Sequence, residues 1–343
     1  MNINYIISLI TVIVLFLIAY IGVEVAGLQI LFGIFLPYAA FLIFIIGICY
    51  RVMEWAKSPV PFSIPTTCGQ QKSLSWIKPN PIDNPTTKGA VIIRMIFEIF
   101  CFRSLFRNTI SKLNGGSKLS YKLEISLWAF ALLFHYSFLV VLLRHLRFFL
   151  EPVPSCIKLV EFFDGFMKVE FINDFIHIGL PGIYLSGFAL LGAVVFLFAR
   201  RVYLPHIRYI SLASDFFPLF LIMGIAISGI FMRYFTKVDI VGVKELTMGL
   251  VTLSPGIPEN VGSVFYVHML FISVLMAYFP FSKLMHMAGV FLSPTRNLTT
   301  NTRAIRHINP WNYPVKIHTY AEYEDEFREK MIEAGLPVEK ELK

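Results

Sequence analysis

The sequence predicts an all-α integral membrane protein, a bundle of six transmembrane helices. Only 15% of the 343 residues are charged, and the mean hydropathy is +0.68. Soluble domains carry about 25% charged residues, so the low charge of this chain argues against a soluble domain. A membrane-spanning helix needs about 20 mainly apolar residues. The segments that meet this requirement are approximately 4–23, 28–50, 124–148, 177–199, 212–234 and 262–285.

The distribution of Lys and Arg predicts the orientation of the bundle. Residues 51–122, 200–210 and 291–343 together hold 22 of them, whereas residues 151–176 and 235–261 hold 4. Basic loops stay in the cytoplasm, so both termini and the long loop are expected there, with the chain in the cell membrane. This topology explains the net charge of +8, and no nucleic-acid partner is expected.

The chain divides into four regions. One of them is the long loop, 51–122, which includes a stretch rich in Pro, Ser and Thr (57–88) and an amphipathic pattern (89–113). We interpret that pattern as a helix lying in the plane of the inner membrane surface, or as a docking site for a soluble subunit. The acidic end of the tail, 319–343, has a helical pattern and is expected to bind a partner protein. The regions are two N-terminal transmembrane helices (1–50), a cytoplasmic loop (51–122), a four-helix transmembrane core (123–290) and a cytoplasmic tail (291–343).

Four histidines lie in two of the apolar segments. His135 and His145 are ten residues apart, and His268 and His286 are eighteen apart. A histidine in hydrocarbon is costly unless it has a partner. Because the two segments cross the membrane in opposite directions, His145 is level with His268 near the outside, and His135 with His286 near the inside. Each pair can hold one b-type haem through two axial imidazoles, so two haems are predicted.

The two spacings do not match for straight helices. At about 100° per residue, eighteen residues return to the same face, whereas ten end about 80° away. Pro280 lies between His268 and His286, and we expect it to kink the last span. Haem propionates need cations. Arg144 and Arg147 flank the outer pair and are predicted to bind the cofactor there, and the cations nearer the inner pair are Lys283, Arg200 and Arg201.

A cluster of polar residues lies at the outer end of the fourth span, which His177 begins. His177 lies close to Asp174 and Lys168, where a quinol could lose protons near the outer haem. These three residues are therefore candidate catalytic residues. The alternative is an ordinary interfacial polar cluster.

The histidine spacing resembles that of the gamma subunit of respiratory nitrate reductase. That resemblance implies two b haems and electron transfer from quinol to a cytoplasmic iron–sulfur subunit. It implies that His135 and His286 hold the inner haem and that His145 and His268 hold the outer one. The quinol site of the family uses a Lys just before the following span, and Lys168 is the Lys nearest to that position.

The extra first span, the long loop and the NPWNYP motif of the tail depart from nitrate reductase. They resemble the membrane subunit of the sulfite-reduction-associated complex, also known as the cytochrome b subunit of the heterodisulfide-reductase-like menaquinol-oxidising enzyme. This resemblance implies menaquinol as the electron carrier and a cytoplasmic iron–sulfur partner similar to the catalytic subunit of heterodisulfide reductase. Other membrane and extracytoplasmic redox subunits are also expected.

Other functions stay open at this point. The chain could be a quinol-oxidising subunit of the nitrate reductase gamma type, or a membrane anchor whose haems are structural. A proton-coupled transporter is a different class, in which the histidines relay protons. It is disfavoured because the carboxylates in the spans, Glu124 and Asp215, lie near span ends.

Overall fold

The computed structural model is mostly helical and confirms the predicted six-span bundle. It describes residues 3–60, 64, 69–115, 118–166, 170–173, 176–179, 182–305 and 317–340. Within them, six helices are long and apolar enough to cross a membrane. They are α1 (Ile3–Glu24), α2 (Leu36–Lys57) after the π-helical turn η1 (Leu31–Phe35), α5 (Ile125–His145) with η2 (Leu146–Phe148), α7 (Leu185–Tyr203), α9 (Ala213–Phe231) with η3 (Met232–Thr236), and α11 (Ser263–Tyr278) with the 3-10 turn η4 (Phe279–Phe281).

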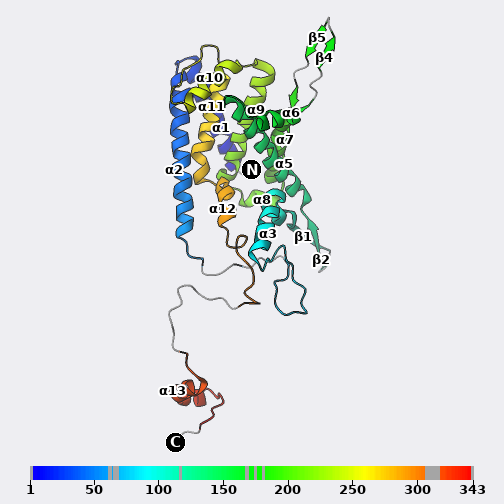
Figure 1. Cartoon of the computed structure of the whole chain (residues 1–343), viewed down its shortest axis with the longest axis vertical. Helices are drawn as coiled ribbons and strands as arrows, with labels where there is room; N and C mark the ends of the chain where they lie inside the picture. Colours follow the sequence, from blue (N-terminus) through cyan, green and yellow to red (C-terminus); the bar gives the residue numbers. More distant parts are fainter. Residues whose placement is uncertain are drawn as a thin grey trace.

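The spans pack in an order that leaves α5 and α2 at opposite sides of the bundle (Figure 1). α5 lies along α7, α7 along α9, α9 against α1 and α11, and α11 against α2. Close packing needs small residues, and a Cβ added to Gly224 of α9 would lie 2.8 Å from the Phe271 ring of α11. The core therefore centres on α9 and α11, where Phe216, Leu221 and Val267 are fully buried.

One end of the bundle, which the charge distribution predicts to face outward and which is called the outer end below, carries short elements between the spans. The fourth span begins at Leu185 and not near 177 as predicted, because residues 176–179 form a strand. Gly179, Pro181 and Gly182 disfavour helix in this stretch. The elements here are α6 (Ser155–Asp164), the paired strands β3 (Gly165–Phe166) and β6 (Ile183–Tyr184), the paired strands β4 (Glu170–Asn173) and β5 (Ile176–Gly179), and α10 (Ile240–Val251).

The inner end carries the loop between α2 and α5 together with the start of the tail. The amphipathic helix ends at Cys101 and not near 113, because the chain then turns and forms a β-hairpin. Asn114 ends the first strand and Gly115 follows it, and an Asn-Gly pair is typical of such a hairpin. The elements here are α3 (Lys88–Cys101), α4 (Arg103–Phe106), the hairpin strands β1 (Thr109–Asn114) and β2 (Lys118–Leu123), α8 (Pro205–Ile210) and α12 (His286–Leu292).

The loop before α3 is ordered by the chain's own tail. Residues 69–87 form no helix or strand, as the Pro-rich composition predicts. The Thr300 amide donates to the Pro85 carbonyl at 2.7 Å, and the Gln71 side chain donates to Thr302 Oγ1 at 3.0 Å. Pro85 and Thr300 are fully buried, so the two segments pack together without another protein.

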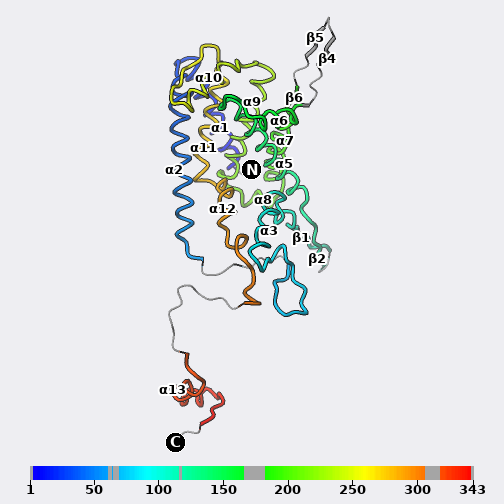
Figure 2. The backbone as a smooth tube through the Cα atoms, in the orientation of Figure 1, coloured from blue at the N-terminus to red at the C-terminus, as the bar shows by residue number. Residues whose placement is uncertain are grey.

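The predicted tail helix is present as α13 (Tyr320–Glu333). Thr319 caps its first turn by accepting from the Glu322 amide, and Glu322 accepts from the Thr319 amide in return. The Glu324 carboxylate accepts from the amides of Glu339 and Lys340, which fixes the end of the described tail against the helix. The backbone trace shows α13 apart from the bundle (Figure 2). Its role in partner binding stays a prediction.

Candidate haem-binding site

The outer histidine pair joins the end of α5 to α11. The rings of His145 and His268 have their centres 6.4 Å apart, and their planes are inclined by 22°. His145 Nδ1 lies 2.7 Å from the Val141 carbonyl one turn earlier, and His268 Nδ1 lies 2.8 Å from Ser228 Oγ of α9. The outer pair predicted from the sequence is therefore brought together.

The position of Ser228 favours the His268 tautomer that carries its proton on Nδ1. The Ser228 hydroxyl donates to the Gly224 carbonyl at 2.7 Å, so its oxygen is left to accept from the His268 Nδ1–H group. A Cβ added to Gly229, the next residue, would lie 3.4 Å from Cε1 of the His268 ring. The fifth span thus orients this ring by a hydrogen bond and by close backbone approach.

The inner pair joins the middle of α5 to the start of α12. The rings of His135 and His286 have their centres 5.9 Å apart and are inclined by 83°. His135 Nδ1 lies 2.7 Å from the Ala131 carbonyl, and His286 Nδ1 lies 2.8 Å from the Lys283 carbonyl. The inner pair is also the one predicted.

The four rings fit axial ligation of a metal macrocycle. Each Nδ1 faces a hydrogen-bond acceptor, which favours the tautomer whose Nε2 lone pair is free to bind a metal. An imidazole nitrogen binds a transition metal at about 2 Å, so two rings on opposite sides of one metal have centres about 6 Å apart. Both pairs have this separation. Among the described residues, no group of three or more metal-ligating side chains offers a different metal site.

The last span is broken where the sequence predicted a kink. α11 ends at Tyr278, and two short 3-10 turns, η4 (Phe279–Phe281) and η5 (Lys283–Met285), lead to α12, which begins at His286. Pro280 has no amide to continue the helix, and it is buried against Gly47 of α2. Because His268 and His286 are not on one continuous helix, the mismatch between the two spacings no longer applies.

The two arginines beside His145 contact carboxylates of α6. Arg144 Nε lies 2.8 Å from Asp164 Oδ2, and Arg147 pairs with Glu161. The guanidinium carbon of Arg144 lies 3.7 Å from the centre of the Tyr184 ring. Binding of haem propionates by Arg144 and Arg147 stays a prediction.

Tyr184 and the two carboxylates were not found by sequence reasoning. Burial and the hydrogen bond to Glu161 raise the pKa of Tyr184, so it remains a donor at neutral pH. The Arg233 guanidinium also lies over this ring, 3.9 Å from its centre. Asp164 accepts from the amide and the hydroxyl of Ser186 at 2.8 and 2.6 Å. No sequence motif links these residues, which come from four segments.

The predicted quinol-site residues are only partly visible. Lys168 and Asp174 lie outside the described residues. His177 is described only through its backbone, in β5, where it is paired with Ile172 of β4. The predicted grouping of these three residues is therefore not tested.

The inner cations contact carboxylates at the ends of spans. Lys283 Nζ lies 2.6 Å from Asp215 Oδ1, and Arg200 pairs with Glu124. Arg201 donates to Ser211 Oγ at 3.4 Å. These three cations are therefore arranged around the span ends and not only around the inner histidines.

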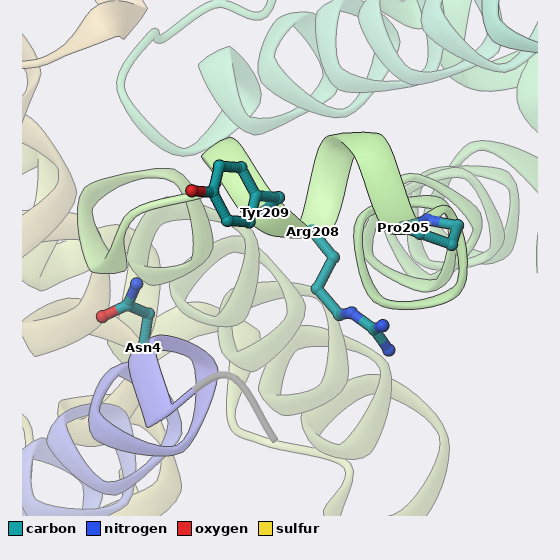
Figure 3. Close-up of a pocket in the computed structure, with 4 residues that line it drawn as sticks. All are labelled: Asn4, Pro205, Arg208 and Tyr209. Atoms are coloured by element: carbon teal, nitrogen blue, oxygen red, sulfur yellow. The ribbon is translucent and has the colours of Figure 1, made fainter.

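Two cavities open at the inner end. One of about 410 Å³ reaches His286 and is also lined by Arg51 and Trp55 of α2. The other, of about 430 Å³, lies between the start of α1 and α8 (Figure 3). It is lined by Asn4, Pro205, Arg208 and Tyr209, with no histidine of either pair, so it is not part of the candidate site.

A transmembrane helical bundle with a histidine pair toward each end is the arrangement of a membrane cytochrome b. Residues 95–307 match the family model of the nitrate reductase gamma subunit. The chain therefore belongs to the nitrate reductase gamma subunit family, as its histidine spacing predicted. Because this is a membrane cytochrome b family, membership implies that the chain holds haem.

Two curated relatives cover most of the chain. The Hdr-like menaquinol oxidoreductase cytochrome b-like subunit of Archaeoglobus fulgidus is 47% identical over 290 residues, covering 82% of this chain and 84% of that protein. The protein of the same name from Archaeoglobus profundus is 43% identical over 284 residues, covering 81% of each chain.

Ser228→Ala is expected to weaken haem binding at the outer pair. The variant leaves the His268 Nδ1–H group without its acceptor, and loss of such a partner typically lowers metal affinity about 10- to 100-fold. Haem loss to excess apomyoglobin, followed optically, measures the change. Ser228→Thr keeps the hydroxyl and serves as the matched control. Equal haem retention in Ser228→Ala and wild type would contradict the assigned role.

Proposed function

We propose that the chain is the cytochrome b-like subunit of an Hdr-like menaquinol oxidoreductase. It carries electrons between menaquinol and a cytoplasmic iron–sulfur subunit similar to the catalytic subunit of heterodisulfide reductase. The observation that carries this proposal is the presence of two histidine pairs. In each pair the ring centres are separated as expected for two axial ligands of one metal, and each Nδ1 lies at hydrogen-bond distance from an oxygen. The names and coverage of the two relatives support the menaquinol chemistry.

The proposal assigns two haems b. His145 and His268 hold the outer one, and His135 and His286 hold the inner one. A haem held by two imidazoles passes single electrons and leaves no metal position open for a substrate. His135 and His145 are ten residues apart on α5, which is about 15 Å along the helix axis. Between these two histidines, Phe138 and Val141 pack against an apolar cluster that includes Ile222 of α9.

The proposed direction is from the outer side inward, with both termini in the cytoplasm. Menaquinol binds near the outer pair and releases its protons outside, where Lys168, Asp174 and His177 are the proposed proton-handling residues. Arg144 and Arg147 are the proposed partners of the outer propionates. Moving one electron across the membrane is worth about 2.3 kcal/mol per 100 mV of potential, so the direction matters energetically.

The identity of the relatives also guides the choice of partners. We propose that the subunit works in a sulfite-reduction-linked complex, with further membrane and extracytoplasmic redox subunits. A quinol-oxidising subunit of the nitrate reductase gamma type is the second candidate, supported by the family match. The transporter reading loses support because the buried carboxylates Glu124 and Asp215 are paired with Arg200 and Lys283 at the inner end of the bundle.

His145→Ala is expected to abolish reduction of the inner haem by a menaquinol analogue. Removing an axial ligand of the outer haem interrupts the only proposed route from the outer quinol site. Stopped-flow absorbance of the α band measures the reduction, and dithionite serves as the control because it reduces the inner haem directly. Unchanged quinol-driven reduction in the variant would show that electrons enter elsewhere.

A further inference from the structure

The segment α3–α4 does not lie flat beneath the bundle but runs up and back along α5. The Tyr136 hydroxyl donates to the Phe100 carbonyl at 2.9 Å, near the end of α3. On the way back, the Phe106 ring packs against Trp128 at 5.0 Å, and the Asn108 side chain donates to Glu124 at 3.0 Å. Tyr136 is eleven residues beyond the start of α5, which is about 16 Å along the axis. The tip of this segment therefore reaches well inside the span.

The outward face of α3 is apolar, and the charged side chains Arg94 and Glu98 lie on its inward face. Val91 and Arg94 are buried, and Glu98 binds Arg296 at 2.8 Å. This is the reverse of a helix whose outer face meets water. The side chains exposed on the other face, here named the α3 stripe, are Ile92, Ile93, Ile96, Phe97 and Phe100.

The α3 stripe is continuous with a surface that the span already presents to lipid. Leu133, Tyr136 and Leu139 of α5 are exposed at the level that α3 reaches. An exposed patch of this size requires an explanation, which is normally a partner or a membrane. Because the hydroxyl of Tyr136 binds the end of α3, the two exposed surfaces adjoin, and the same acyl chains can cover both.

Side chains of α5 donate hydrogen bonds to the last carbonyls of α3. The last carbonyls of a helix lack intrahelical partners and usually bind water. In hydrocarbon such groups must be satisfied by protein. The Phe100 carbonyl accepts from Tyr136, and the Cys101 carbonyl accepts from Trp128 Nε1 at 2.8 Å. These two hydrogen bonds are what a helix end placed inside a membrane requires.

Phe102 forms the tip of the turn and contacts the inner pair. Its backbone is left-handed, with φ 49° and ψ 49°, which is uncommon for a bulky residue. The turn places the Phe102 ring edge-on against His135, with centres 4.8 Å apart and planes inclined by 89°. A strained residue that the surrounding structure holds in place often has a functional position.

We propose that α3 and α4 form a re-entrant hairpin in the cytoplasmic leaflet, with lipid acyl chains on the α3 stripe. Its tip residue, Phe102, closes the His135 side of the inner pair against water, whereas His286 lines the cavity of about 410 Å³. Arg103 and Arg107, which follow the tip, pair with Asp83 on the side of the cytoplasmic loop. The hairpin thus separates the inner pair from the aqueous phase on the face of α5 that it covers.

The first test measures what surrounds the α3 stripe. Ile96→Cys is labelled with a fluorophore in the full-length subunit, whose own four cysteines have been replaced, and the labelled subunit is reconstituted into phosphatidylglycerol nanodiscs. Leu139→Cys is the lipid-facing control, and Tyr121→Cys on the exposed β2 strand is the aqueous control. Quenching of the Ile96 label by lipid-borne nitroxide to the extent seen at Leu139 supports the proposal. Quenching by aqueous iodide as at Tyr121, or protection from both quenchers as under a protein partner, overturns it.

The second test concerns Phe102 and rests on the proposed haem at the inner pair. Phe102→Ala is expected to speed oxidation of the reduced inner haem by ferricyanide, a water-soluble oxidant, and to leave the outer haem unchanged. Phe102→Leu, which keeps an apolar side chain at the tip, is the matched control. An unchanged rate in Phe102→Ala overturns the closing role. The labelling test needs no haem, so its outcome is independent of whether the proposed function holds.

Discussion

Replacing His268 with alanine is expected to remove one haem from the purified subunit and leave the other bound. His268 is buried, lies 6.4 Å from His145 between ring centres, and has its Nδ1 held by Ser228. It is thus oriented to supply one of two axial nitrogens. A macrocycle with one remaining histidine loses half of its axial ligation, whereas the inner pair uses different residues and is untouched.

The expected haem content falls from two per polypeptide to about one, the residual haem being that of the inner pair. The pyridine haemochrome assay measures this content against protein concentration. His286→Ala is expected to give the same count by losing the other haem, and the two residual haems should differ in spectrum. His206→Ala, in the short helix α8 away from both pairs, is the control and should keep both haems. Full haem content in His268→Ala would contradict the assigned pairs.

Asp164→Ala is expected to destabilise the outer end of the bundle strongly. The Asp164 side chain is 5% exposed and contacts Arg144, whose side chain is 12% exposed, as well as the amide and hydroxyl of Ser186. It thereby joins α6 to α5 and α7. Removing one partner of a buried ion pair leaves the other charge buried, which costs about 3–5 kcal/mol.

Thermal unfolding in detergent, followed by circular dichroism, measures this loss as a lower Tm. Glu151→Ala is the matched control, because Glu151 pairs with Lys244 but its side chain is 61% exposed. Exposed ion pairs contribute at most about 1 kcal/mol, so this variant should melt close to wild type. A Tm for Asp164→Ala that equals that of the control would show that the Asp164 contacts are not structural.

The bundle and its histidine pairs could be predicted because their signals are local. Each span is a run of apolar residues, and the alternating direction of the spans decides which histidines share a level. The positions of His135, His145, His268 and His286 therefore follow from hydropathy and topology. The residues that orient the histidine rings cannot be predicted from hydropathy and topology. Ser228 is one serine among several in apolar helices, and its contact with His268 forms between residues 40 positions apart.

The errors in the sequence prediction have local physical causes. The break after Tyr278 was expected as a kink, but a proline alone does not show whether the helix resumes; here Pro280 packs on Gly47 and the chain continues as 3-10 turns. The amphipathic pattern of residues 89–113 correctly predicted the helix α3. Its orientation depends on Tyr136 and Trp128, which bind its end from another segment. Periodicity carries no information about such contacts.

Haem content of the wild-type subunit tests the central claim most directly. The measurement is the haem-to-polypeptide ratio of the detergent-purified chain, with the reduced-minus-oxidised spectrum and a potentiometric titration of its α band. The account predicts two b haems per chain with low-spin spectra. It also predicts two resolvable midpoint potentials, because His268 of the outer pair is buried and bound to a serine hydroxyl, whereas His286 of the inner pair is exposed and bound to a backbone carbonyl. A chain that binds no haem, or only one, would contradict it.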